Sequence, residues 1–282
     1  MRGARLAALL RPIGWLGLAV FVVIYLFPLY WLLNTSIKPR AELFGATPTL
    51  IAQRPTLEPY VNVLFERGFI ELLRNSLLVC SLTVLLTLTI SLAITYPITR
   101  LPVSRRLRVG VLNWALSLRF LPPIAVVVPY FVVVRTVGLY NSPLALVLVY
   151  TLSNLPFGIW MLKGFLSEVP LELEEAAYVD GATRSQAFRR ILLPLVAPGL
   201  LASAVIIFAF CWSEFLFALI LTATRDAQTF PVGVQGLVTQ FEIIWNQMAA
   251  AGVIAIAVPL VLMFLARRYV LAGLTFGVIR EK

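Results

Sequence analysis

Long apolar segments are the feature that most constrains what this chain can fold into. Six can be distinguished, and each has about the 20-residue length at which a helix crosses the hydrocarbon core of a bilayer. They lie at about residues 13–33, 76–98, 109–134, 143–162, 199–222 and 248–266. In lipid the backbone must satisfy its own hydrogen bonds, which a helix does within one segment. We therefore predict an all-α integral membrane protein, a single domain over residues 1–282 with six transmembrane helices.

The composition supports a membrane protein over a soluble one. Hydrophobic residues make up 60% of the 282 residues and charged residues only 13%, and the mean hydropathy is +0.93. A soluble domain of this length needs a more polar exterior than these residues can build.

The net charge of +10 is interpreted as a topology signal and not as a sign of nucleic-acid binding. Suppose that the N-terminus, the second connection, the 163–198 insert and the C-terminus share one side. That side then carries 15 of the 23 Lys and Arg residues, the other side carries 7, and Arg119 lies inside a segment. Because basic residues accumulate on the cytoplasmic side, both termini and the insert are predicted to be cytoplasmic.

Missing residue types exclude several chemistries. The chain has no histidine, so histidine-based zinc sites and Ser-His or Cys-His relays are absent. It also has no G-x-x-x-x-G-K-[ST] motif, so no P-loop can bind ATP. The only aspartates are Asp180 and Asp226, which lie far apart in the predicted topology. We expect no catalytic residue, no metal and no cofactor in this chain.

The 163–198 insert is a polar segment between two apolar ones. Pro170 and the glutamates that follow suit the first turn of a helix, and Gly181 supplies its C-terminal stop. Thr183 with Gln186 three positions on is a capping-box signature for a second short helix, which should end before Pro194. Taken on these grounds alone, the insert is either a solvated loop at the membrane surface or a docking surface for a partner.

The spacing within this insert carries a family resemblance. Glu175-Ala176-Ala177, three residues, Gly181, nine residues, Ile191, one residue and Leu193-Pro194 match the EAA---G---------I-LP signature at every fixed position. The signature resembles that of membrane subunits of binding-protein-dependent ABC importers. Four further segments look like MalG-type permeases of the carbohydrate-uptake subfamily: FPLYWLLNTSIKP, LPPIAVVVPYFVVVRTVGLYNSPLALVLVY, WSEFLFALILT and AGLT. The resemblance covers nearly the whole chain, from about residue 15 to residue 277.

The resemblance implies a type I ABC importer permease fold with a cytoplasmic coupling-helix loop. In that family the loop docks on a separate ATPase subunit, which would hold ATP and Mg, in a bacterial or archaeal cytoplasmic membrane. Further implied partners are a homologous second permease, two copies of the ATPase and an extracytoplasmic solute-binding protein. The residues carried over for coupling are Glu174, Glu175, Ala176, Ala177, Asp180, Gly181, Ala182, Ile191, Leu193 and Pro194.

Residues of the translocation pathway are less determined by the sequence. Arg119 and Glu214 are charges inside apolar segments, so each is either functional, part of a structural ion pair, or near a wet helix end. Trp212 is a face on which a sugar stacks, a packing residue or an interfacial anchor. Asn154 either faces the pathway or satisfies a carbonyl freed by Pro156. Ser213 stands where the family often has asparagine before the glutamate.

The sequence bears on three function classes. A permease subunit of an ATP-driven importer agrees with the complete motif and the missing ATP site. An ATP-independent channel or ion-coupled carrier should have more intramembrane carboxylates than Glu214 alone. An intramembrane enzyme would need catalytic residues, such as histidines or paired aspartates, that this chain does not have. We expect the first class, with a sugar as the solute, or alternatively a polyol or a glycerol phosphate ester.

Overall fold

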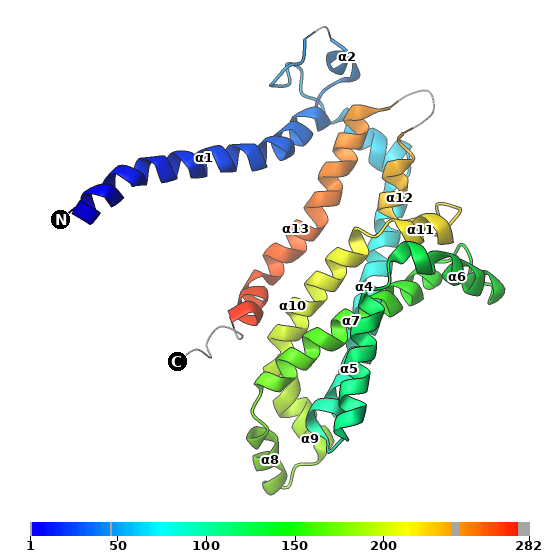
Figure 1. Cartoon of the computed structure of the whole chain (residues 1–282). Coiled ribbons are helices and arrows are strands. Elements are labelled where there is room, and N and C mark those ends of the chain that lie inside the picture. The colour runs from blue at the N-terminus through cyan, green and yellow to red at the C-terminus, as the bar shows by residue number, and fades with distance from the viewer. Residues whose placement is uncertain (1, 46, 239–242, 276–282) are drawn as a thin grey trace. The chain divides into compact units, whose positions relative to one another are not determined.

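The computed structural model describes residues 2–45, 47–238 and 243–275, with side chains described between residues 14 and 268 of these ranges. The predicted cytoplasmic C-terminus at 276–282 and residues 239–242 of the last connection lie outside the described residues. The chain is built from helices (Figure 1). They are α1 (Arg2–Ser36), α2 (Arg40–Leu43), α3 (Glu58–Val61), the π-helix η1 (Asn62–Glu66), α4 (Phe69–Arg100), α5 (Arg105–Arg119), α6 (Pro123–Thr136), α7 (Pro143–Glu168), α8 (Glu172–Val179), α9 (Arg184–Ala187), the π-helix η2 (Phe188–Leu192), α10 (Leu193–Trp212), α11 (Leu216–Leu221), α12 (Phe230–Gln235) and α13 (Trp245–Thr275).

The predicted all-α membrane fold is confirmed. Within the part of the chain that the structure describes, five helical segments are long and apolar enough to cross a membrane: those of α1, α4, α7 and α13, and the run that ends with α10. The pair α5 and α6 makes a sixth if its two helices form one bent span.

Two expected spans are broken in the structure. The single helix expected over 109–134 is instead α5 and α6, whose axes are bent by 98° at the break. Pro122 and Pro123 stand there, and a proline removes a helical hydrogen bond and keeps the preceding residue out of helical geometry. The helix expected over 199–222 ends at Trp212, and the short α11 begins after three intervening residues.

The chain divides into two compact units: Met1–Phe69 with Val234–Ile256, and Ile70–Gly233 with Ala257–Lys282. In the first unit, side chains organise the connection that follows α1. The Asn34 amide donates to the carbonyl of Leu50 at 2.8 Å and accepts from the Ala52 N–H at 2.9 Å. The Glu42 carboxylate accepts from the Thr49 hydroxyl at 2.6 Å and from the Gln53 N–H at 3.0 Å. This connection is therefore folded and not an extended linker.

The Glu42 contacts predict a pH-dependent loop. The hydrogen bond from Thr49 lowers the pKa of the Glu42 carboxyl, and the backbone N–H groups of Gln53 and Arg54 add to this against partial desolvation. Because the folded pKa is lowered, the stabilisation is complete above the ordinary glutamate pKa and is lost as pH falls through the folded value. We expect amide protection over residues 47–57, corrected for intrinsic exchange, to fall between pH 7 and about pH 3.

Hydrogen exchange read by mass spectrometry measures this protection. Glu42→Gln is the matched control, because its protection should already be reduced at pH 7 and should change little with pH. Amides of α7 report whether the whole protein has unfolded. Equal corrected protection of the loop at both pH values in the unaltered protein would contradict the role given to Glu42.

In the second unit, α7 packs closely against α4 and α10 through glycines. A Cβ atom added at Gly158 of α7 would lie 2.3 Å from Ser91 Oγ and 3.2 Å from Thr87 Cγ2, both on α4. A Cβ added at Gly199 of α10 would lie 2.3 Å from the Phe165 ring on α7. Small residues let membrane helices approach closely, and here they bring three spans together. Cys80 and Cys211 are free and buried in this unit.

Candidate functional site

A glycine turn joins the two short helices of the polar insert. Gly181 has a φ of +85°, the left-handed conformation that glycine adopts without strain. The Ala182 N–H donates to the carbonyl of Ala177 at 2.9 Å, and the Gly181 N–H donates to the carbonyl of Tyr178 at 3.1 Å. This is a Schellman motif, which satisfies carbonyls at the end of α8. The predicted stop at Gly181 is confirmed.

The second helix of the insert begins with a complete capping box. The Thr183 hydroxyl accepts from the Gln186 N–H at 3.3 Å, and the Gln186 side chain accepts from the Thr183 N–H at 2.7 Å. Two N–H groups that the helix start leaves unpaired are thereby satisfied. The predicted capping box is confirmed.

The prediction that this helix ends before Pro194 is wrong. Helices α9, η2 and α10 form one helical run over Arg184–Trp212. In the wider turn of η2, the Leu193 N–H donates to the carbonyl of Phe188, five residues back. A π-turn lets a helix accommodate a local irregularity without ending. Pro194 has no N–H to be satisfied, and it lies in the first turn of α10, where proline is tolerated. Ile191, Leu193 and Pro194 therefore lie within a helix that continues into the membrane span.

Helix α8 presents one exposed face and one buried face. Glu172, Glu175, Ala176 and Val179 are exposed at the spacing i, i+3, i+4 and i+7, which places them on one side of the helix. We call this set the exposed α8 face. Val179 is 88% exposed, and no sequence signal had marked it. Asp180 and Gly181 at the helix end are also exposed, and Ala182 is half-buried.

Two of the predicted coupling residues point the other way. Ala177 is buried, so of the Ala176-Ala177 pair only Ala176 lies on the exposed α8 face. Glu174 is 1% exposed, and its carboxylate faces Arg100 at the end of α4. Burial raises the pKa of the Glu174 carboxyl above its ordinary value, and the Arg100 guanidinium opposes this. Arg100 was not anticipated, because it lies 74 positions away in sequence.

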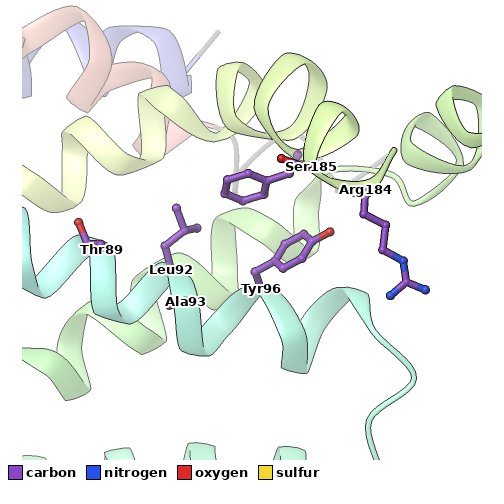
Figure 2. A pocket seen from close by; sticks show the side chains of 7 residues that line it. Thr89, Leu92, Ala93, Tyr96, Arg184 and Ser185 are labelled. Atoms are coloured by element: carbon purple, nitrogen blue, oxygen red, sulfur yellow. The ribbon is translucent and has the colours of Figure 1, made fainter. Parts of the chain in front are cut away.

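An apolar groove of about 430 Å³ lies beside the second helix of the insert. Figure 2 shows Thr89, Leu92, Ala93 and Tyr96 on α4, with Arg184 and Ser185 on the facing helix. Phe188 completes the lining, and its ring meets that of Tyr96 edge-on at 5.1 Å between centroids. The groove shows where the insert and α4 meet.

A second cavity, of about 460 Å³, brings together three of the residues nominated for the pathway. Arg119, Asn154 and Glu214 all line it, although they come from the end of α5, the middle of α7 and the break between α10 and α11. Aromatic side chains from three elements share the lining: Tyr130, Phe210 and Phe217. The cavity therefore combines a cation, a carboxylate and an amide with aromatic walls.

The two charges of this cavity are held separately. The Arg119 guanidinium lies 5.2 Å from the Phe210 ring centroid and 5.6 Å from that of Phe157, which is cation–π geometry. The Glu214 carboxylate accepts from the N–H groups of Phe217 at 2.9 Å and Ala218 at 3.3 Å, capping α11. Backbone N–H groups of α11, and not the structural ion pair that the sequence left open, therefore hold the Glu214 carboxylate.

Of the other predicted pathway residues, Asn154 lines the cavity, whereas Trp212 and Ser213 do not. The Asn154 amide donates to the carbonyl of Tyr150 at 2.9 Å, whereas Pro156 frees the carbonyl of Leu152, so the carbonyl-satisfying interpretation is not supported. Trp212 is 5% exposed and stacks on Phe208 at 5.8 Å and on Phe230 at 6.1 Å between centroids. The Ser213 hydroxyl donates to the carbonyl of Ala209 at 2.8 Å. Neither Trp212 nor Ser213 is part of the cavity lining.

Comparison with known proteins agrees with these features. The family model described as binding-protein-dependent transport system inner membrane component matches residues 86–275. The chain is 35% identical over 271 residues to the trehalose/maltose transport system permease protein MalG of Thermococcus litoralis, covering 94% of this chain and 95% of the relative. It is also 35% identical to the trehalose transport system permease protein SugB of Mycobacterium tuberculosis, covering 96% and 98%.

A solved structure extends the likeness to the fold. A chain from a bacterial ABC transporter involved in the import of the acidic polysaccharide alginate superposes with a TM-score of 0.76 at 17% identity, covering 95% of this chain and 97% of that chain. The spans, the paired helices around Gly181 and the matches in sequence and structure lead to one assignment. The chain belongs to the family of inner membrane components of binding-protein-dependent transport systems, as a permease of the MalG type.

Proposed function

We propose that this chain is one half of the translocation pathway of an ATP-driven sugar importer. It pairs with a homologous second permease, with two copies of an ATPase subunit that hold ATP and Mg, and with an extracytoplasmic solute-binding protein. The observation that carries the proposal is the exposed α8 face, held at a defined angle by the Gly181 turn. Membership of a binding-protein-dependent family supports the same assembly.

Coupling follows from how the insert is built. The exposed α8 face offers Glu175, Ala176 and Val179 to a groove on the ATPase subunit, on the cytoplasmic side together with both termini. Because the second insert helix runs without a break into α10, movement of a docked insert is carried into a membrane span. Closure of the ATPase pair on ATP would then switch the permeases between inward-open and outward-open states.

The solute class is inferred from the cavity and from the relatives. Arg119, Asn154 and Glu214 supply donors and acceptors for hydroxyl groups, and the aromatic walls suit the apolar faces of a sugar ring. Relatives that match more than nine-tenths of this chain are named for trehalose and maltose. We therefore expect an oligosaccharide of this kind to be the solute.

Uptake by the complete complex in proteoliposomes tests this function. Trehalose, maltose, diacetylchitobiose, glycerol and glycerol 3-phosphate form the panel of radiolabelled solutes, with ATP inside the vesicles. We expect ATP-dependent accumulation of a sugar of the panel. Accumulation of glycerol 3-phosphate alone would replace the sugar assignment by an anionic ester.

A cavity variant tests the pathway assignment. Arg119→Gln removes a charged donor from the cavity, so we expect the KM for uptake of the transported sugar to rise by about tenfold, which corresponds to about 1.4 kcal/mol. ATPase co-purification should stay unchanged. Arg135→Gln is the matched control, because Arg135 is an exposed arginine of α6 outside the cavity lining. A KM for Arg119→Gln equal to that of Arg135→Gln would place the solute elsewhere.

A further inference from the structure

Arg100, the last residue of α4, contacts two other elements at the base of the insert. Its Nε lies 3.1 Å from Glu174 Oε1 on α8. Its Nη2 donates to the carbonyl of Leu166 at 2.6 Å and to that of Val169 at 2.9 Å, at the C-terminal end of α7. One guanidinium therefore joins the ends of α4, α7 and α8.

This junction is enclosed and its charges are matched. The side chains of Arg100 and Glu174 are 6% and 1% exposed. The carbonyls that Arg100 binds lie at the negative end of the α7 dipole, where a cation is stabilised. The rigid fork of a guanidinium presents several N–H groups at fixed angles, so it can bind a carboxylate and carbonyls at once. Removal of one partner would leave a buried charge uncompensated.

Glu174 lies on the opposite side of α8 from the exposed α8 face. Glu175 and Val179 point outward, whereas Glu174 points to α4. A partner that pushes on the outer face therefore pushes α8 against Arg100. Helix α8 therefore has an exposed face for a partner on one side and its contact with Arg100 on the other.

The two halves of the insert are attached to different spans. The second half continues by covalent connection through η2 into α10. The first half reaches α4 through the ion pair, and the edge-on contact of Tyr96 with Phe188 adds a contact between α4 and η2. Displacement of the insert thus has a covalent route to α10 and a non-covalent route to α4.

We propose that Arg100 is a positioning residue that carries the displacement of α8 to α4 through its ion pair with Glu174. The inference rests on the proposed function, because it needs an ATPase that moves α8. It adds a specific prediction: without the ion pair the ATPase still docks and hydrolyses ATP, but α4 does not follow and the cavity does not change its accessibility.

The test uses the complete complex and needs no knowledge of the solute. Leu152→Cys places a thiol at an exposed position of the cavity lining, while Cys80 and Cys211 are buried. The rate of labelling by a membrane-impermeant maleimide is measured with and without trapping by ATP and vanadate. In this background we expect trapping to change the labelling rate by roughly tenfold, as for a shift of about tenfold in a two-state population.

Three variants in that background separate positioning from folding. Glu174→Gln breaks the pair, and the double change Arg100→Met with Glu174→Leu replaces both charges by apolar side chains of similar size, leaving no lone buried charge. Glu168→Gln alters an exposed glutamate at the end of α7 and is the matched control. We expect the double variant to be as abundant as the background protein, to bind the ATPase and to be trapped by vanadate. Its labelling rate should nevertheless no longer respond to trapping, whereas that of Glu168→Gln should respond fully.

The outcomes separate two failures. A double variant whose labelling still responds fully to trapping would overturn the role of Arg100 and leave the importer assignment intact. If the background protein itself bound no ATPase and showed no response to vanadate, the proposed function would fail, and the inference with it.

Discussion

Replacing Gly181 by valine is expected to lower ATPase docking and ATP-driven uptake together, each by about tenfold or more. Gly181 sits at a φ of +85°, and left-handed geometry costs a β-branched residue about 1–3 kcal/mol. An added Cβ would meet nothing within 4 Å, so the cost is one of backbone conformation and not of a steric clash. Valine would relax this strain by opening the turn, which changes the angle between α8 and α9.

Asparagine is the informative control at this position, because it tolerates the left-handed conformation far better than valine does. Gly181→Asn should retain most docking and uptake. For Gly181→Val we expect co-purification of the ATPase and uptake both to fall by about tenfold or more, since every 1.4 kcal/mol corresponds to a factor of ten. Wild-type levels of both in the valine variant would show that α8 is not the docking helix.

The second large effect is expected at Gly158, at the contact of α4 with α7. A Cβ there would lie 2.3 Å from Ser91 Oγ and 3.2 Å from both Ser91 Cβ and Thr87 Cγ2, so alanine requires the Ser91 hydroxyl to rotate away and the two helices to move apart by a few tenths of an ångström. Overpacking of this kind costs about 1–3 kcal/mol, and a leucine should prevent the packing altogether. We expect Gly158→Ala to lower the thermal midpoint of the detergent-solubilised protein and Gly158→Leu to yield no monodisperse protein.

Gly164 on the same helix is the matched control. It is exposed and has nothing within 4 Å of an added Cβ, so Gly164→Ala should be neutral or slightly stabilising through helix propensity. Ser91→Gly in the Gly158→Ala background should recover part of the lost midpoint, because it removes the atoms that clash. If Gly158→Ala and Gly164→Ala had equal midpoints, the close packing of α4 on α7 would be contradicted.

Features of the fold that depend on neighbouring residues could be predicted from the sequence. The membrane helices follow from segment length and hydropathy, and the turn at Gly181 and the cap of Thr183 with Gln186 follow from local hydrogen bonding. The continuous helix through Pro194 could not be predicted. The π-turn of η2 accommodates the proline, and no residue type in the sequence predicts such a turn. The 98° bend between α5 and α6 depends on packing, although Pro122 and Pro123 mark its place.

The candidate site divides in the same way. Arg119 and Glu214 could be predicted as pathway candidates because they are charges inside apolar segments. That they line one cavity with Asn154 depends on the tertiary fold. Trp212 and Ser213 stand close to Glu214 in sequence and still fall outside that lining, because α10 ends at Trp212 and Glu214 lies in the non-helical break before α11. The pairing of Glu174 with Arg100 depends on where two distant helix ends meet.

Dependence of uptake on the ATPase subunit tests the importer assignment most directly. Proteoliposomes are prepared with the permease pair alone, with the complete complex, and with the complete complex carrying Gly181→Val, each with ATP inside and the binding protein outside. We predict full accumulation of the sugar only with the complete, unaltered complex, and accumulation lower by about tenfold or more with Gly181→Val. Without the ATPase subunit or without ATP we predict no accumulation. Accumulation of the sugar by the permease pair without the ATPase would identify an autonomous channel or carrier and contradict the assignment.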